Sequence, residues 1–194
     1  MDHRDHVGLL RDGVPPNARA SMLATWADIG AGTGAFTLAL ADLLGPGARI
    51  VAVDRDRGAL AQTARAMAER FPGTTFEAIV GDLAAPLAVR PLDGLVAANS
   101  LHFVPGGRQI DVVRQLATYL RPGGAFLIVE YDADHGNPWV PHPFSASSWQ
   151  RMAAEAGLID TRPIGRVPSR FLGAIYSAAS RTPERPASAS ASRS

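Results

Sequence analysis

Short apolar runs alternate along the chain with longer alanine- and leucine-rich stretches of helical period. This alternation is typical of βαβ units, in which parallel strands are joined by crossover helices. The apolar runs predict strands at residues 25–29, 49–53, 74–80, 92–98 and 125–130. The longer stretches predict four helices. The first covers about residues 34 to 44, the second follows the strand at residues 49–53 and ends near residue 70, and the last two cover residues 108 to 120 and 147 to 156.

Glycine and proline refine this outline. Arg121–Gly124 predicts a turn before the fifth strand, and two prolines between residues 82 and 91 predict a short or irregular crossover. The continuous apolar run that ends at Glu130 indicates a strand buried on both faces. Two last strands, at residues 158–164 and 169–176, are joined by a short loop containing Pro168; this spacing is too short for a helical crossover and predicts an antiparallel pair.

The composition favours one globular unit. A chain of 194 residues with 46% hydrophobic composition can bury a core without disulfides or metals. We expect a leading segment at residues 1–24, an α/β domain at 25–178 and a disordered tail at 179–194, because the tail is small, polar and rich in proline and serine.

Missing residue types exclude several kinds of chemistry. Without cysteine there is no disulfide framework, thiolate metal cage or cysteine nucleophile. All nineteen basic residues are arginine, so Schiff-base chemistry and a P-loop lysine are absent. The net charge of +1 and the lack of a dense basic run speak against nucleic-acid or membrane partners. The charged start of the chain and the lack of a run of about 18 apolar residues predict a soluble, cytoplasmic protein.

A glycine-rich loop and an acid carry the first functional signal. Gly30-Ala-Gly-Thr-Gly34 lies between the first predicted strand and helix, where glycines let the backbone approach a ligand and a helix amino terminus favours a negative group. With Ala35 the run also satisfies a variant of the dinucleotide fingerprint, so two cofactor classes stay open. Asp54 ends the second strand, 24 residues after Gly30. Its carboxylate would either accept hydrogen bonds from a ribose diol or cap the next helix.

Five segments occur in an order that resembles the motifs of class I S-adenosylmethionine-dependent methyltransferases. They are Ala27–Gly34, Val51–Asp54, Gly81–Asp82, Ala98–Phe103 and Leu120–Gly124. The chain resembles especially the general small-molecule methyltransferase domains related to quinone-biosynthesis enzymes, over about residues 25 to 132. The resemblance implies an α/β, Rossmann-like three-layer sandwich with a seven-stranded, mostly parallel sheet of order 3-2-1-4-5-7-6 and an antiparallel strand 7.

The resemblance also implies S-adenosyl-L-methionine as the cofactor and assigns residues to it. Asp28 and Gly30 would lie near its methionine portion, Asp54 at the ribose hydroxyls, and Asp82 with Leu83 at the adenine edge. Asn99 would face the reacting methyl group. Gly81-Asp82 is equally well suited to a plain turn. The full set of implied cofactor-binding residues is Asp28, Gly30, Gly32, Gly34, Asp54, Arg55, Asp82, Leu83 and Asn99.

Catalysis of methyl transfer needs little covalent machinery. The reaction is an in-line displacement, so the protein aligns the acceptor and keeps the site dry. A hydroxyl or ammonium acceptor also needs a base, for which His102, just past the fourth strand, is the first candidate. Packing within its loop is the competing interpretation for His102. The further candidates follow the fifth strand: Glu130 and Tyr131, then Asp132, Asp134 and His135.

Residues 130–144 form the most distinctive segment outside the cofactor motifs. Their aromatic and proline residues could wall an apolar or aromatic acceptor, or Trp139 and Phe144 could pack at the edge of the core. Glu130, His135 and His142 show no recognisable ligand spacing, so we expect no metal.

The sequence thus predicts a methyltransferase for a small-molecule acceptor. Few residues precede the first strand and the loop after the fifth is short, so the acceptor pocket would be open, small, or completed by a second copy in a homodimer. A short helix near residues 5–11 would fold over the cofactor or serve ordinary packing. Two alternatives stay open: a nicotinamide-dependent oxidoreductase using the same loop and acid, and a non-catalytic module that binds S-adenosylmethionine.

Overall fold

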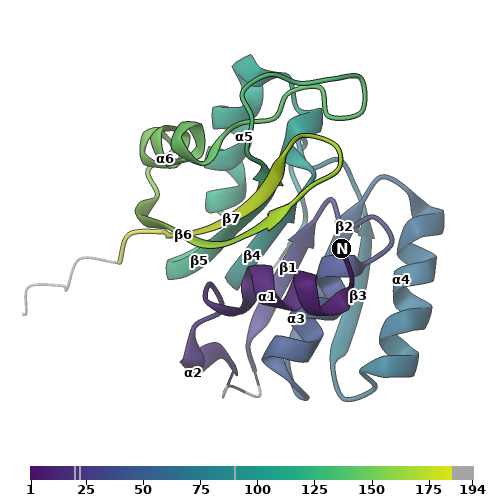
Figure 1. Cartoon of the computed structure of the whole chain (residues 1–194). Coiled ribbons are helices and arrows are strands. Elements are labelled where there is room, and N and C mark those ends of the chain that lie inside the picture. Colours follow the sequence, from purple (N-terminus) through teal and green to yellow (C-terminus); the bar gives the residue numbers. More distant parts are fainter. Residues whose placement is uncertain (20, 22, 90, 185–194) are drawn as a thin grey trace, which may run out of the picture.

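A seven-stranded sheet forms the centre of the molecule (Figure 1). The computed structural model describes residues 1–19, 21, 23–89 and 91–184. The strand order is β3-β2-β1-β4-β5-β7-β6, and β7 runs antiparallel to both of its neighbours while the other pairs are parallel. This confirms the predicted fold class. The strands are β1 (Thr25–Ile29), β2 (Arg49–Asp54), β3 (Thr75–Val80), β4 (Leu92–Ala98), β5 (Leu120–Tyr131), β6 (Ile159–Pro168) and β7 (Ala174–Arg181).

Helices cover both faces of the sheet and give it two cores. In the central strands, Trp26 and Val96 point into one core, whereas Ala27 and Leu95 point into the other. Strands buried on both faces read as continuous apolar runs, which explains their clear signal in the sequence. The first core is covered by α1 (His3–Arg11), α2 (Pro16–Arg19), α3 (Ala35–Leu44) and α4 (Arg57–Arg70), the second by α5 (Gly106–Ala117) and α6 (Ala146–Glu155).

The connectivity decides where a ligand can bind. β1 pairs with β2 on one side and with β4 on the other, so the order of the strands reverses at β1. Open α/β sheets bind ligands at such a switch point, in the crevice outside the carboxyl ends of the strands. The crossover from β3 to β4 contains no helix among its described residues, in agreement with the short or irregular crossover predicted there.

The predicted turn at Arg121–Gly124 is wrong as a separate element. β5 already begins at Leu120, opposite Leu92 of β4, and the pairing resumes at Ala125 opposite Gly94. The residues between them bulge out of the ladder, and Gly123 takes a φ of 74°, a left-handed conformation that favours glycine. A short 3₁₀ helix, η1 (Leu101–Phe103), was also not predicted.

The last hairpin is displaced from its predicted position. We expected its second strand at residues 169–176, but β6 extends through Pro168 and β7 occupies Ala174–Arg181. The nearly continuous burial of β7 between β5 and β6 fixes this register, because a shift would expose its apolar residues. Residues 179–181 therefore belong to the sheet rather than to the tail, whose residues 185–194 lie outside the described part of the chain.

The leading segment forms the helix α1. It packs against α3, β6 and β7, and the side chain of Asp2 caps its first turn. These contacts fit the packing interpretation, and a position over the cofactor stays a prediction. None of the described helices is long and apolar enough to span a membrane.

Candidate functional site

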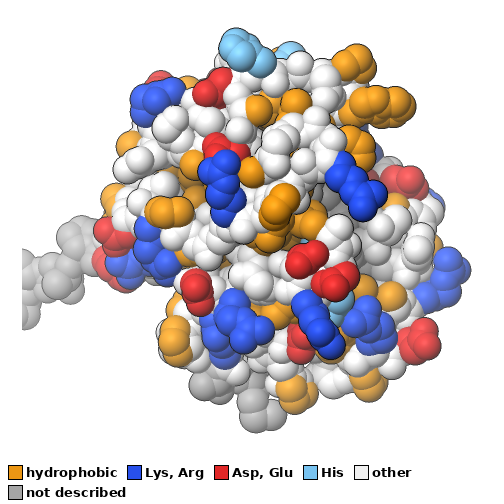
Figure 2. Space-filling view, in the orientation of Figure 1, with side chains coloured by type: hydrophobic (Ala, Val, Ile, Leu, Met, Phe, Trp, Pro, Cys, Tyr) orange, Lys and Arg blue, Asp and Glu red, His pale blue; other side chains and the backbone are white. Residues whose placement is uncertain are grey.

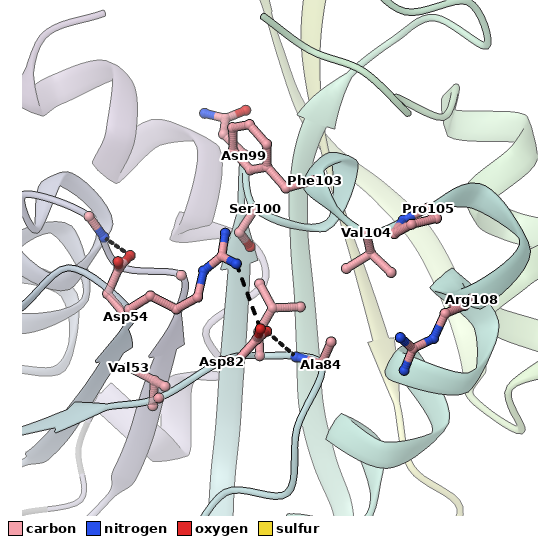
Figure 3. A pocket seen from close by; sticks show the side chains of 15 residues that line it. Val53, Asp54, Asp82, Ala84, Asn99, Ser100, Phe103, Val104, Pro105 and Arg108 are labelled. Carbon is pink, nitrogen blue, oxygen red and sulfur yellow. Dashed lines mark hydrogen bonds and ion pairs between the residues drawn. The ribbon is translucent and has the colours of Figure 1, made fainter.

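A cavity of about 450 Å³ lies at the switch point, at the carboxyl ends of the strands (Figure 3). Segments that follow four neighbouring strands form its walls. The residues predicted from the sequence that line it are Gly30, Gly32, Asp54, Arg55, Asp82, Leu83 and Asn99. Of the predicted cofactor-binding set, Asp28 and Gly34 lie outside this lining.

The glycine loop combines a packed position with an open one. A Cβ atom on Gly34 would lie 2.5 Å from Cγ2 of Thr63 on α4, and its φ of 86° is left-handed. Gly34 is therefore required by the packing of α3 on α4. A Cβ atom on Gly32 would meet nothing within 4 Å, because this residue faces the cavity. Gly32 is the point at which a ligand can approach the backbone closely.

Asp54 organises the loop at the end of β2. Its Oδ2 accepts a hydrogen bond of 2.8 Å from the backbone N–H of Gly32 (Figure 3), and its Oδ1 accepts one of the same length from the backbone N–H of Asp56. Asp56, not Asp54, caps α4, because the Asp56 side chain accepts from Gly58 and Ala59. The capping interpretation of Asp54 is therefore wrong, and the second lone pair of each Asp54 oxygen is left for a ligand.

Asp82 and Arg55 form an ion pair in the lining of the cavity. Asp82 Oδ1 accepts a hydrogen bond of 2.9 Å from the backbone of Ala84, which holds the carboxylate at the start of its loop. Nη1 of Arg55 lies 3.7 Å from Asp82 Oδ2 in an ion pair that is open to solvent (Figure 3). Such exposed pairs contribute little stability, so Arg55 can reorient when a ligand enters.

Two buried side-chain oxygens, one on β1 and one directly after β4, have no hydrogen-bond partner among the described residues. Asp28 is fully buried; its Oδ2 accepts from Thr37 Oγ1 at 2.6 Å, whereas its Oδ1 has no hydrogen-bond partner among the described residues. Burial raises the pKa of Asp28 to about 7, against the lowering effect of the Thr37 hydrogen bonds. Asn99 takes a left-handed φ of 50°, and its buried Oδ1 is likewise without a described partner. Strained backbone and orphaned acceptors are features that cluster at functional sites.

The three predicted catalytic residues come together, next to the cavity rather than in its lining. His102 and Glu130 are both buried, and Nδ1 of His102 lies 2.9 and 3.0 Å from the two carboxylate oxygens of Glu130. The ring of Tyr131 lies edge-on to that of His102, with 5.8 Å between centroids. Burial and the nearby charge of Glu130 raise the pKa of Tyr131, so this phenol stays protonated at neutral pH.

The other acids after β5 have structural partners. Asp132 accepts a hydrogen bond from the backbone of Ala146 and pairs with Arg166. Asp134 accepts from the backbone of Ser145, which lowers the pKa of its carboxyl. Trp139 is exposed, whereas Phe144 is buried and stacks on Trp149, with 5.9 Å between the ring centroids. No three potential ligand side chains converge on a metal position in the part of the chain that the structure describes.

The sequence missed one wall of the cavity. The segment that runs from the end of β4 through η1 to the first turn of α5 lines it with Ser100, Phe103, Val104, Pro105 and Arg108. Ser100 also ties the ends of two strands together, because its hydroxyl donates to the carbonyl of Ile29. These residues could have been predicted from their position directly after β4, because ligands bind at this edge of the sheet.

Comparison with known proteins gives a consistent result. Residues 27–124 match the model of a family described as a methyltransferase domain. The chain is similar to the YcgJ protein from Bacillus subtilis, with a TM-score of 0.71 and 16% identity over 94% of this chain and 100% of that one. It is also similar to magnesium protoporphyrin IX methyltransferase from Synechocystis PCC 6803, solved with bound S-adenosylmethionine, with a TM-score of 0.71 and 15% identity over 93% of this chain and 79% of that one.

A third similar structure is an S-adenosylmethionine-dependent methyltransferase from Clostridium acetobutylicum ATCC 824, with a TM-score of 0.67 and 11% identity over 94% of this chain and 93% of that one. Identities this low show a shared fold. No curated protein sequence matches the chain significantly. From the family match, the chain belongs to the methyltransferase domain family, and it shares the fold of these solved structures.

Proposed function

We propose that this chain transfers a methyl group from S-adenosylmethionine to a small-molecule acceptor by in-line displacement. The observation that carries the proposal is a series of carboxylate and amide oxygens at the carboxyl ends of four parallel strands: Asp54, Asp82 and Asn99 line one cavity, and the buried Asp28 lies two residues before Gly30 of its lining. The bound cofactor supplies an electrophilic methyl carbon on a sulfonium cation. Binding, alignment and proton transfer fall to the residues of the chain.

The charge of the site fits such a cation. The unpartnered Oδ1 atoms of Asp28 and Asn99 would accept hydrogen bonds from the cofactor's ammonium group. Asp28 and Asp54 would also favour the positive sulfonium. A nicotinamide dinucleotide would instead bring a pyrophosphate beside these acids, which is electrostatically unfavourable. This contrast supports methyl transfer over the oxidoreductase alternative.

Four further residues would hold the rest of the cofactor. Asp54 keeps lone pairs for the ribose hydroxyls while it holds the glycine loop through Gly32. Asp82 and Leu83 would lie at the adenine edge, where the Ala84 hydrogen bond leaves acceptor capacity on the Asp82 carboxylate. The position of Gly32 would let the cofactor approach without a steric clash.

For a hydroxyl acceptor, we assign the role of general base to His102 and that of positioning residue to Glu130. The two Glu130 oxygens around Nδ1 keep the proton on that nitrogen, so the lone pair is on Nε2. His102 would take the acceptor's proton at Nε2, and the buried carboxylate would stabilise the resulting imidazolium. Tyr131, kept neutral, would serve as a hydrogen-bond donor or wall rather than as a base.

Mass spectrometry of host metabolites incubated with the enzyme and S-adenosylmethionine tests this function. We expect at least one metabolite to gain the mass of one methylene, and replacing the cofactor methyl by its trideuterated form to shift that gain accordingly. Retained cofactor binding without transfer to any acceptor would instead support the non-catalytic module. The cytoplasmic location and the homodimer remain predictions from the sequence.

A further inference from the structure

Four aromatic side chains form a row beyond the cofactor cavity, which we call the aromatic row: Phe103, His102, Tyr131 and Phe171. Successive ring centroids are 4.2 Å apart between Phe103 and His102 and 5.8 Å apart between His102 and Tyr131. The row ends at Phe171, 6.5 Å from Tyr131. Its members come from η1, from the end of β5 and from the loop between β6 and β7, so only the folded chain assembles it.

The two ends of the row are exposed although its middle is buried. Phe103 is 57% exposed and Phe171 is 64% exposed, whereas Tyr131 is 9% exposed. Large apolar side chains that gather at the surface commonly mark a binding site. Hydrophobic side chains are visible on the upper part of the face in Figure 2, where Figure 1 shows the loops after β5 and between β6 and β7.

The row is continuous with the cofactor cavity. Phe103 belongs to both, and it lies with Asn99 at one end of the cavity in Figure 3. Asn99 is the residue assigned to the reacting end of the cofactor, and His102, assigned as the base, is the next ring in the row. A molecule against Phe103 would therefore lie between the methyl donor and the base.

The polar groups of the row indicate the charge of its occupant. The buried carboxylate next to the row, Glu130, is already paired with His102. The next acid along the chain, Asp132, is paired with Arg166. The rings themselves offer faces and edges that favour offset-stacked or edge-to-face contact with another aromatic ring. A charged acceptor would find no uncompensated partner among the four members, so the row favours a neutral one.

We propose that the aromatic row is the acceptor site of the proposed methyltransferase and takes a neutral, planar aromatic compound with a hydroxyl group. The acceptor ring packs against Phe103, the member of the row that lines the cavity, its hydroxyl faces His102, and Phe171 bounds the far end of the site next to Tyr131. This inference rests on the proposed function. A second copy of the chain is a weaker candidate, because two exposed rings are far short of the roughly 800 Å² per partner that stable interfaces bury.

Equilibrium binding to the full chain, saturated with S-adenosylhomocysteine, tests the proposal with three probes of similar size. Naphthol is planar, neutral and hydroxylated; decalol lacks the aromatic rings, and naphthoate carries a charge. We expect naphthol to bind at least about tenfold more tightly than either of the others, since both ring contacts and neutrality are required. Equal binding of all three probes, or no binding of naphthol to a chain that does bind S-adenosylhomocysteine, overturns the acceptor site alone. A chain that does not bind S-adenosylhomocysteine overturns the proposed function instead.

Variants connect the binding to the row. Phe103→Ala should weaken naphthol binding about three- to tenfold, Phe171→Ala should weaken it by a smaller factor, and Phe103→Tyr should keep the affinity of the wild type. Trp139→Ala is the matched control, because Trp139 is 78% exposed but belongs to no ring pair of the row. Unchanged affinity of the Phe171→Ala variant for S-adenosylhomocysteine, together with an unchanged circular dichroism spectrum, shows that it folds. An equal loss in Trp139→Ala, or a dimer that dissociates on Phe171→Ala while naphthol affinity is unchanged, contradicts the proposal.

Discussion

The buried carboxyl of Asp28 makes the stability of this protein depend on pH in a direction unusual for an aspartate. Its pKa is raised to about 7 by burial, whereas an aspartate in the unfolded chain titrates near 3.8. Between these two values the native state keeps a proton that the unfolded state has released. The free energy of unfolding therefore falls as the pH rises from about 4 to about 7, and this contribution levels off above 7.

The magnitude follows from the same shift. Each pKa unit corresponds to 1.36 kcal/mol, so raising the Asp28 pKa from 3.8 to about 7 lowers the free energy of unfolding at pH 8 by about 4 kcal/mol relative to pH 4. Asp28→Asn removes the titration but keeps an oxygen that can accept from Thr37. We expect the variant to match the wild type near pH 4 and to exceed it by up to about 4 kcal/mol at pH 8, while its affinity for the cofactor falls.

Urea unfolding of the apo protein from pH 4 to 8 measures this difference. Subtracting the two curves removes the contribution of groups that titrate equally in both proteins. Thr37→Val is a matched second variant: loss of the hydroxyl removes a hydrogen bond that lowers the Asp28 pKa, so the decline should extend to higher pH. A stability difference between Asp28→Asn and the wild type that stays constant over this range would refute the reasoning.

The remaining predictions concern the loop, the helix cap and the catalytic pair. Gly34→Ala should destabilise the protein by several kcal/mol in thermal unfolding, whereas Gly32→Ala should cost about 1 kcal/mol and chiefly weaken S-adenosylhomocysteine binding. Asp56→Ala should lower stability by about 1 kcal/mol through loss of the α4 cap, with cofactor affinity nearly unchanged in calorimetry. His102→Gln should lower kcat about 10²-fold or more on a hydroxyl acceptor without changing cofactor affinity, and Glu130→Gln should lower kcat with little change in KM. Equal losses of cofactor affinity in these two variants would mean that the pair is structural.

The strands that could be predicted best are those whose burial is set by their immediate neighbours. β1 and β4 occupy the predicted residues because both are central, apolar on both faces and bounded by polar or glycine-rich segments. The register of β7 could not be read from the chain. Its position depends on pairing with β5, far away in sequence, and Ser169-Arg170-Phe171 looks as strand-like as the residues that follow.

The candidate site shows the same division. Asp54, Asp82 and Asn99 lie at the carboxyl ends of β2, β3 and β4, which with β1 make up one parallel part of the sheet, so the order of the motifs was enough to bring them together. Pairing of His102 with Glu130 also follows from the adjacency of β4 and β5, although the hydrogen-bonded geometry does not. Phe171 gave no functional signal, because its approach to Tyr131 depends on the displaced hairpin loop.

We hold above all that Asp54 and its neighbours bind S-adenosylmethionine in the cavity at the carboxyl ends of β1, β2, β3 and β4. Calorimetry of the full chain with S-adenosylhomocysteine and with NAD tests it most directly, using the wild type, Asp54→Ala and the cap variant Asp56→Ala. We predict that the wild type binds S-adenosylhomocysteine and not NAD, that Asp54→Ala loses about tenfold or more in affinity, and that Asp56→Ala changes little. Binding of NAD in place of S-adenosylhomocysteine, or equal affinity of the wild type and Asp54→Ala, would contradict it.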